Sequence, residues 1–310
     1  MGGAGSVWVG THREPDGDAI GSLLGLGHIL KAAGIRSTLA CADPVPADLC
    51  FLPGARGVVS RGPEGEDLVV ALDAGDLGRL GDLIAPEDWA RRRTVVLDHH
   101  ASNSGYGSVD VVVPDVASTS ELVLDLARLL GVKPTPEAAT CLLTGILTDT
   151  LGFRTSNTTS GTLRRAADLV DLGGPLSDIV EKVFASRPLH TMLLLGRALE
   201  SLKVIDGLGV AILSVTDLDE LGAGAADTRG ISSFLATTRE LAAVALLKER
   251  PDGKTDVSMR SKPGIDLVPV ARRLGGGGHP QAAGATLGAA GPEATAQVWQ
   301  ALRRGIGQTT

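Results

Sequence analysis

Three apolar runs in the first hundred residues each end in histidine or aspartate. VWVGTH ends at His12, DLVVALD ends at Asp73, and TVVLDHH closes on Asp98, His99 and His100. The runs are short, β-branched and nearly continuous, which is typical of strands buried on both faces of a parallel sheet. Because ligands of open α/β sheets bind beyond the carboxyl ends of the strands, the pattern predicts one polar crevice at a single sheet edge.

Segments with helical spacing alternate with these runs. AIGSLLGLGHILKAAG, TSELVLDLARLLG and PEAATCLLTGILTDT carry apolar residues at helical intervals, and STLACA favours a further strand. This order of elements predicts an α/β fold with a doubly wound, mainly parallel sheet.

After residue 185 the pattern changes. LGVAILSVT, LAAVALLKER and TDVSMRSK favour strands, and PDGK is a good hairpin turn between the last two. DLVPVARRLGG and PEATAQVWQALRRG favour amphipathic helices. We therefore expect a first domain over residues 1–185, a linker helix over 186–200, and a smaller α+β domain over 201–310.

The bulk composition is that of a soluble globular protein, with 43% hydrophobic and 21% charged residues. No apolar run reaches the length that spans a bilayer, and no basic region precedes the first apolar stretch, so we expect neither a membrane segment nor a secretory signal. The 3 cysteines form no CxxC pair, which indicates reduced thiols in a cytoplasmic protein.

The net charge of -7 argues against a protein that grips long duplex nucleic acid, because such proteins usually present a basic face. Aromatic residues make up only 3% of the chain, too few for an extended stacking platform for single strands. The composition favours a small anionic substrate.

The segment THREPDGDAIGS carries the sharpest local motif, His12-x-x-x-Asp16-x-Asp18. Pro15 and Gly17 favour a turn between strand and helix, from which two carboxylates could reach separate ions. The alternative is structural, with Asp18 as the cap of the helix and Asp16 on the surface.

The remaining acidic positions have alternatives of their own. Asp73 could simply be a turn aspartate at the end of a strand. Two adjacent histidines beside Asp98 at the end of a buried strand are costly unless they are paired or bind a metal. Asp149 lies in an otherwise apolar helix, which favours a ligand over a solvated helix end. Carboxylate and imidazole groups suit Mn²⁺, Zn²⁺ or Fe²⁺.

The second domain offers a candidate anion site. Arg260 and Lys262 end one predicted strand, and His279 follows the glycine run 275–278. We interpret that run as a loop whose backbone N–H groups could converge on a phosphate, and a flexible turn is the alternative. Because the run precedes a strand, it is no dinucleotide-binding fingerprint.

In combination these motifs resemble a known family. HREPDGDAIGS, Asp73, DHH and TDT resemble, in order, the four motifs of the DHH phosphoesterase superfamily, and VSMRSKPGIDLVPVARRLGGGGHPQAAG resembles the DHH-associated C-terminal domain. The pairing is most similar to the bacterial oligoribonuclease and phosphoadenosine-phosphate phosphatase group, the nanoRNases. The resemblance spans nearly the whole chain, and every metal position of the motifs is filled.

The resemblance implies a two-metal site in the first domain and substrate contacts in the second. One ion would be bound by His12, Asp16 and Asp73. The other would be bound by Asp18, Asp73, His99 and Asp149, so that Asp73 bridges. The implied ion is Mn²⁺, with Mg²⁺, Co²⁺ or Fe²⁺ as alternatives.

The remaining implied roles concern catalysis and binding. Asp98 would support the ligands from behind, and His100 would face the scissile phosphate. The far phosphate or nucleotide of the substrate would contact five residues of the second domain: Arg260, Lys262, Gly277, Gly278 and His279.

The implied activity is hydrolysis of short oligoribonucleotides and linear dinucleotides such as pApA to 5′-mononucleotides, with adenosine 3′,5′-bisphosphate as a second substrate. A cyclic dinucleotide (c-di-AMP) phosphodiesterase and an inorganic pyrophosphatase are the alternatives within the superfamily. A processive exonuclease and a sensor that has lost catalysis are less favoured, because the chain is acidic and no metal position is missing. The resemblance also implies a cytoplasmic homodimer that binds neither membrane nor long duplex.

Overall fold

The computed structural model describes residues 5–186, 188–228 and 230–306, and it divides the chain into two compact units, Met1–Ser186 and Arg187–Thr310. Among the described residues, no helix combines the length and apolar character needed to cross a membrane.

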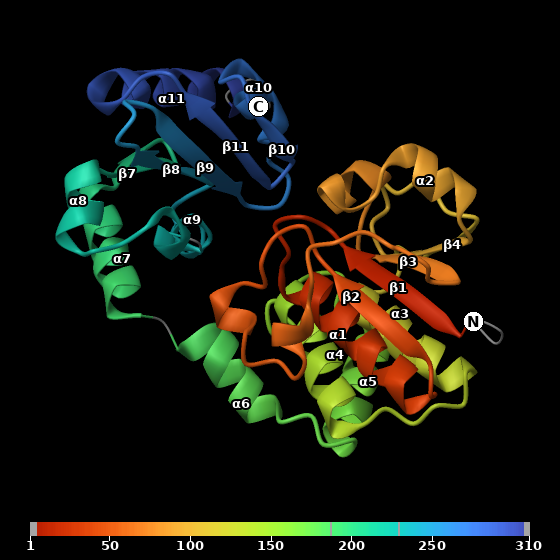
Figure 1. Cartoon of the computed structure of the whole chain (residues 1–310). Coiled ribbons are helices and arrows are strands. Elements are labelled where there is room, and N and C mark those ends of the chain that lie inside the picture. The colour runs from red at the N-terminus through yellow and green to blue at the C-terminus, as the bar shows by residue number, and fades with distance from the viewer. Residues whose placement is uncertain (1–4, 187, 229, 307–310) are drawn as a thin grey trace. The chain divides into compact units, whose positions relative to one another are not determined.

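The first unit is built on a five-stranded, all-parallel sheet with the strand order β2-β1-β3-β4-β5 (Figure 1). The strands are β1 Ser6–Thr11, β2 Arg36–Ala40, β3 Leu68–Leu72, β4 Thr94–Asp98 and β5 Val109–Val112. Four of the five were predicted. β5 was not, because its sequence VDVV is short and mostly exposed and lacks the apolar continuity of the others.

Both faces of this sheet are covered, as the doubly wound prediction requires. Val7 and Val9 of β1 face one hydrophobic core with α1, α3 and α4, whereas Trp8 faces a second core beneath η3 and α2. Figure 1 shows α2 and the group α1, α3, α4 and α5 on opposite sides of the strands. The helical elements of the unit are α1 Gly17–Ala32, η1 Ala47–Leu49, η2 Ala55–Gly57, η3 Leu77–Leu83, α2 Pro86–Arg91, α3 Thr119–Leu129, α4 Pro136–Asp149, α5 Ser160–Asp171, α6 Leu176–Val180 and the π-helical turn η4 Glu181–Ala185.

The strand order places a topological switch between β1 and β3. The chain leaves β1 toward β2 on one side and returns to β3 on the other, so the connections diverge above this pair. Thr11 and Leu72 are register partners at the ends of these strands. The residues that follow them, His12 and Asp73, therefore emerge side by side at the point where open α/β sheets bind ligands.

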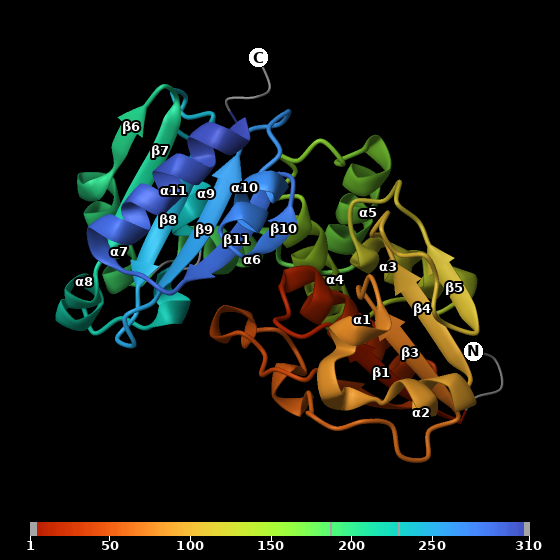
Figure 2. The same cartoon turned by 90° about the horizontal axis from the view of Figure 1, so that it is seen from above.

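The second unit is a mixed six-stranded sheet with the order β10-β11-β9-β8-β7-β6, in which only β7 and β8 are parallel. Helices cover both faces of this sheet, with α10 and α11 on one and α7, α8 and α9 on the other (Figure 2). Its elements are α7 Leu189–Ser201, β6 Lys203–Ile205, β7 Leu208–Leu213, α8 Val215–Glu220, η5 Ala225–Thr228, α9 Ile231–Leu235, β8 Ala243–Glu249, β9 Thr255–Ser261, α10 Val268–Arg273, β10 Gly277–His279, β11 Ala282–Leu287 and α11 Gly291–Ile306.

Two features of this unit differ from the sequence-based expectation. The predicted linker segment forms α7, whose Leu194 and Ala198 pack against Ala211 and Leu213 of β7, so this helix belongs to the core of the second unit. The predicted glycine loop is partly a strand, because residues 277–279 form β10 and pair with β11. A glycine-only stretch carries no β-forming side chains, so pairing with β11 decides its conformation.

Candidate metal centre

Asp16 and Asp18 enter the centre from the start of α1, in contrasting environments. Asp16 caps the helix, with its carboxylate accepting hydrogen bonds from the backbone N–H groups of Asp18 and Ala19, both at 3.0 Å. The structural alternative that made Asp18 the cap is therefore wrong. The Asp16 side chain is 61% exposed, whereas Asp18 is 1% exposed. One carboxylate thus lies at the rim of the centre and the other at its floor.

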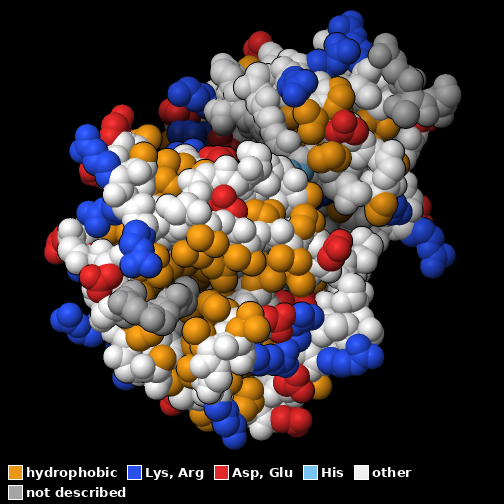
Figure 3. Space-filling view, turned by 90° about the vertical axis from the view of Figure 1, so that its right-hand side faces the viewer, with side chains coloured by type: hydrophobic (Ala, Val, Ile, Leu, Met, Phe, Trp, Pro, Cys, Tyr) orange, Lys and Arg blue, Asp and Glu red, His pale blue; other side chains and the backbone are white. Residues whose placement is uncertain are grey.

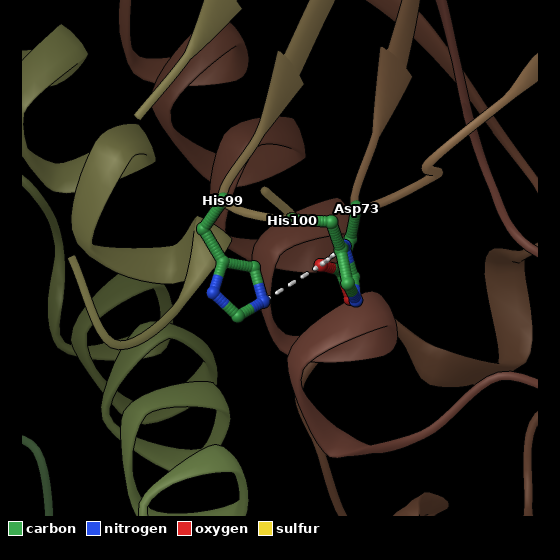
Figure 4. A group of neighbouring side chains, drawn as sticks. All are labelled: Asp73, His99 and His100. Carbon is green, nitrogen blue, oxygen red and sulfur yellow. Dashed lines mark ion pairs between the residues drawn. The ribbon is translucent and has the colours of Figure 1, made fainter. Parts of the chain in front are cut away.

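Asp73 lies at the middle of the cluster. Its Oδ2 is 3.7 Å from His12 Nε2, and its Oδ1 is 3.5 Å from His99 Nε2. Figure 4 shows His99 and His100 directed toward Asp73 from the adjoining strand end. Asp73 has a φ of 57°, a left-handed conformation that Asp tolerates better than most residues and that is common at functional sites. The two carboxylate oxygens therefore face two different imidazoles.

Two further contacts complete the cluster. His12 Nε2 is 3.9 Å from Asp16 Oδ1, and His99 Nε2 is 3.4 Å from Asp149 Oδ2. Three sets of possible ligand atoms each lie within 4.8 Å of one another: His12 with Asp16 and Asp73, Asp73 with His99 and His100, and Asp18 with His99 and Asp149. The structure thus brings together all six residues for which the sequence predicted metal ligation.

This donor set fits divalent metal ions. Two ligands each about 2.1 Å from one ion are separated by roughly 3.0–3.5 Å, close to the nitrogen–oxygen distances in the cluster. Mixed imidazole and carboxylate ligands suit Mn²⁺, Fe²⁺ or Zn²⁺. Because Asp73 and His99 each belong to two of the three sets, the geometry favours two adjacent ions over one.

The concentration of buried carboxylates in the cluster also favours the binding of cations. Burial and the nearby charge of Asp73 raise the pKa of Asp149 to about 7, and the same two causes raise the pKa of Asp18 well above its usual range. Burial lowers the pKa of His12, but its ion pairs with the Asp16 and Asp73 carboxylates outweigh this effect and raise it to about 10. A protonated His12 thus partly compensates the acidic charge, which is the role that bound cations would take over.

Asp98 and His100 form a separate pair beside the cluster. His100 Nδ1 donates a hydrogen bond of 2.7 Å to Asp98 Oδ1, and this bond raises the pKa of His100. Asp98 is fully buried, and its Oδ2 accepts a second bond of 2.7 Å from Asn103 Nδ2. The His100 side chain is 42% exposed, so Asp98 orients an imidazole that remains accessible to a substrate.

The structure places one cation next to the cluster that the sequence did not predict. Arg79, in the turn η3 after β3, has its Nη2 3.1 Å from His12 Nδ1, and it forms no ion pair with a described carboxylate. His12 Nδ1 also lies 2.8 Å from the Arg13 carbonyl, to which it can donate. Arg79 follows Asp73 by six residues, and nothing in that spacing alone indicated that η3 would fold back over His12.

In the second unit, β11 brings two predicted substrate residues into one row. Arg260 of β9 and His279 of β10 are both register partners of Ala282. In-register residues on neighbouring strands point to the same face, so Arg260 and His279 flank the small Ala282 at a Cα separation of roughly 10 Å.

Arg260 of this row and Lys262, two residues further along the chain, have no carboxylate partner among the described residues. Arg260 Nε donates to Ser233 Oγ at 3.2 Å, and Lys262 Nζ donates to the Arg239 carbonyl at 2.5 Å. Neither cation forms an ion pair with a described residue. Burial lowers the pKa of Arg260, yet a guanidinium stays charged in proteins, which leaves a half-buried positive charge that an anion could neutralise.

The glycines beside His279 are explained by strand contact. A Cβ on Gly276 would lie 2.0 Å from the Gly284 carbonyl oxygen, and one on Gly278 would lie 2.5 Å from that of Ala282. A Cβ on Gly277 would meet nothing within 4 Å. Gly276 and Gly278 therefore permit the close approach of β10 to β11, while Gly277 faces open space.

Comparison with known proteins gives matches along both units. The DHH family, N-terminal domain, matches residues 6–146, and the DHHA1 domain matches residues 195–305. The chain is 38% identical to the bifunctional oligoribonuclease and PAP phosphatase NrnA of Thermus thermophilus, over 91% of this chain and 84% of that protein. It is 29% identical to the cyclic-di-AMP phosphodiesterase PdeA of Listeria monocytogenes, over 88% of this chain and 43% of that protein.

A solved structure shows the same fold. The crystal structure of an exopolyphosphatase-related protein from Bacteroides fragilis matches with a TM-score of 0.91 and 24% identity, covering 98% of this chain and 93% of that one.

Proposed function

The chain belongs to the DHH family of phosphoesterases, and we propose that it hydrolyses short oligoribonucleotides and linear dinucleotides such as pApA to 5′-mononucleotides. Enzymes of this family depend on metal ions. The observation that carries the proposal is Asp73, whose two oxygens face the His12 and His99 imidazoles separately. The similarity to an oligoribonuclease and PAP phosphatase, over nearly the full length of both proteins, favours short RNA over the other substrates of the family.

We propose the ligand assignment that the three sets suggest. His12, Asp16 and Asp73 would bind one ion, and Asp18, Asp73, His99 and Asp149 the other, with Mn²⁺ as the preferred ion. When bound, two such ions lower the pKa of a water molecule and neutralise charge on phosphoryl oxygens.

The residues around the ions would position the phosphate. His100, oriented by Asp98, is accessible and would face the scissile phosphate, where a donated hydrogen bond stabilises the charge that develops in the transition state. Arg79 would add a guanidinium on the His12 side, where its fork can bind two phosphoryl oxygens.

The second unit would recognise the other end of the substrate. Arg260, Lys262 and His279 supply donors without carboxylate partners, and Ala282 leaves a shallow floor between two of them. We propose that they bind a terminal phosphate, with the backbone of Gly277 and Gly278 beside it. Removal of the 3′-phosphate from adenosine 3′,5′-bisphosphate is the second activity that we propose.

A side-by-side assay would test the substrate. The metal-free protein is supplied with Mn²⁺ and given pApA, a short RNA, adenosine 3′,5′-bisphosphate, c-di-AMP and pyrophosphate, and the products are separated by anion-exchange chromatography. We expect pApA and the short RNA to be cleaved fastest, and EDTA to stop every reaction. Faster cleavage of c-di-AMP would establish the cyclic dinucleotide alternative instead, and no cleavage at all would refute the proposal.

We also propose a cytoplasmic homodimer. The three cysteines are free, as in a reducing compartment. β5 is an outer strand that pairs only with β4 in the first unit and exposes Val109 and Val111, a combination that favours pairing with another strand. Figure 3 views the side of the first unit on which β5 lies and shows hydrophobic side chains gathered across that face. Light scattering should give a molar mass of twice the chain mass. The Val111→Lys variant should instead give the mass of a single chain.

A further inference from the structure

Helix α3 begins directly against the buried carboxylates of the metal centre. Its first two residues, Thr119 and Ser120, contact Asp18 and Asp73, although none of the motifs that predicted the centre includes them. We infer that Thr119 and Ser120 are positioning residues that orient Asp18 and Asp73 for metal binding and make the two metal sites unequal in affinity. The inference rests on the proposed two-metal function and adds to it the residues that set its asymmetry.

Three donors from α3 converge on Asp18. The Thr119 N–H donates to Oδ2 at 2.6 Å, while the Ser120 N–H and hydroxyl both donate to Oδ1, at 3.0 and 2.5 Å. A carboxylate offers about four lone-pair directions, so Oδ1 is saturated and Oδ2 retains about one. Asp18 is therefore fixed in one orientation with a single free direction, which suits one ion and excludes a bridging role.

The Thr119 hydroxyl acts on the other buried carboxylate. It donates a hydrogen bond of 2.9 Å to Asp73 Oδ1, the oxygen that faces His99. No described hydrogen bond reaches Asp73 Oδ2, which faces His12. Three of the four donors of α3 thus act on Asp18 alone, and the fourth acts on the Asp73 oxygen that faces His99 and not on the one that faces His12.

The start of α3 is itself held rigidly. Glu121, fully buried, accepts hydrogen bonds from the Ala117 N–H at 3.0 Å and from the Thr162 hydroxyl at 3.1 Å, and it pairs with Arg165 of α5 at 3.1 Å. A buried charge satisfied on this many sides fixes the position of the backbone around it. The donors in front of Glu121 are therefore preorganised before any ion binds.

The opposite side of Ser120 is closed by α4. A Cβ on Gly145 would lie 2.0 Å from the Ser120 hydroxyl oxygen and 2.6 Å from Asp18 Oδ1. Only glycine at this position leaves room for the hydrogen bond between them. The pair is thus enclosed by α1, α3 and α4, which prevents Asp18 from turning away.

The site that contains His12 and Asp16 has no such support from α3. Asp16 is 61% exposed, and the hydrogen bonds that its carboxylate accepts come from the backbone of its own helix. A preorganised ligand loses less freedom when an ion binds, and groups that orient metal ligands typically contribute 10- to 100-fold to affinity. The Asp18 site should therefore fill at a lower Mn²⁺ concentration than the Asp16 site.

Calorimetric titration of the full-length, metal-free protein with MnCl₂ tests this inference. The wild type should show two binding events of different affinity. Ser120→Ala should weaken the tighter event by about 10- to 100-fold and change the weaker one by less than about threefold. Thr119→Val keeps the shape of the side chain but removes the hydroxyl, so it should also weaken the tighter event. Thr119→Ser keeps the hydroxyl and should bind Mn²⁺ with the wild-type affinity.

Thr135→Val is the matched control, because the Thr135 hydroxyl accepts a backbone N–H at the start of α4, far along that helix from Asp149. It should destabilise the metal-free protein to a similar degree yet leave both affinities unchanged. Equal weakening of both events by Ser120→Ala, or no change in either, overturns the inference. If the wild type binds no Mn²⁺ at all, the proposed two-metal function fails instead, which is a distinguishable result.

Discussion

The cluster in the first unit for which we propose metal binding and the row in the second for which we propose phosphate binding differ in how they are built. The centre is formed mainly from buried side chains at the ends of strands and helices, of which Asp18 and Asp73 are 1% and 2% exposed and accept hydrogen bonds from the start of α3. The row is formed from half-buried or exposed side chains, and its Arg260 donates only to the Ser233 hydroxyl and the Met259 carbonyl oxygen among the described residues. From the proposed roles we expect the reaction to depend on rigid residues and recognition on adaptable ones, so substitutions should lower kcat in the first unit and raise KM in the second.

If this contrast is right, replacing Asp73 should cause the largest loss of activity. Asp73→Ala removes the one carboxylate that faces both His12 and His99, so neither ion keeps its ligand set. We expect kcat/KM to fall by roughly 10⁴-fold or more, and the bound Mn²⁺ measured after dialysis to fall from two ions to none. If the variant kept its turnover and lost only one ion, the assignment of Asp73 as a bridging ligand would be refuted.

Replacing Asp98 should cause the next largest loss of activity, because Asp98 acts through His100. Asp98→Asn keeps the shape of the side chain but cannot hold the protonated imidazole, so we expect kcat to fall about 10²- to 10⁴-fold with both ions retained. In a His100→Ala background the same change should have little further effect, which kinetic measurement of the double mutant would reveal. Additive losses would mean that Asp98 serves the metal ligands rather than His100.

The same contrast explains what the sequence could predict. His12, Asp73 and Asp98 follow or end strands whose apolar runs are unmistakable, so their convergence at one sheet edge follows from sheet topology alone. Asp149 was identifiable because it is a carboxylate in an otherwise apolar helical segment, of which it is the last helical residue. These are local signals, and the family resemblance joined them into one site.

The residues that the sequence did not reveal act over long chain separations. Ser120 binds Asp18 across 102 positions, and Thr119 binds Asp73 across 46. At the start of a helix, serine and threonine are expected as caps, so nothing distinguished these two from ordinary capping residues. β5 and β10 were missed for a related reason, since short or glycine-rich strands are specified by their partners and not by their own composition.

In the second unit, Arg260 should govern affinity and not rate. Arg260→Gln would remove the charge-assisted hydrogen bond that we propose to a terminal phosphate, so we expect KM for pApA to rise about 10- to 100-fold with kcat nearly unchanged. The difference from the wild type should shrink with ApA, which lacks the terminal phosphate. Arg250→Gln is the control, because Arg250 already pairs with Asp252 and Asp256 and should not bind the substrate. A fall in kcat as large as the rise in KM would place Arg260 in the reaction itself.

The smallest effect is expected at Gly277, and it decides whether the glycine run serves the fold or the substrate. An alanine methyl there would meet nothing within 4 Å, whereas at Gly278 it would meet the Ala282 carbonyl in a backbone with a φ of 143°. Gly277→Ala should therefore leave Tm unchanged and KM within about twofold of the wild type, while Gly278→Ala should lower Tm by several degrees, since strained positive-φ positions cost of order 1–3 kcal/mol. If Gly277→Ala instead raised KM about tenfold at unchanged Tm, the added methyl would be occupying space that the phosphate needs, and the phosphate would lie against the Cα of Gly277 and not only near its N–H group.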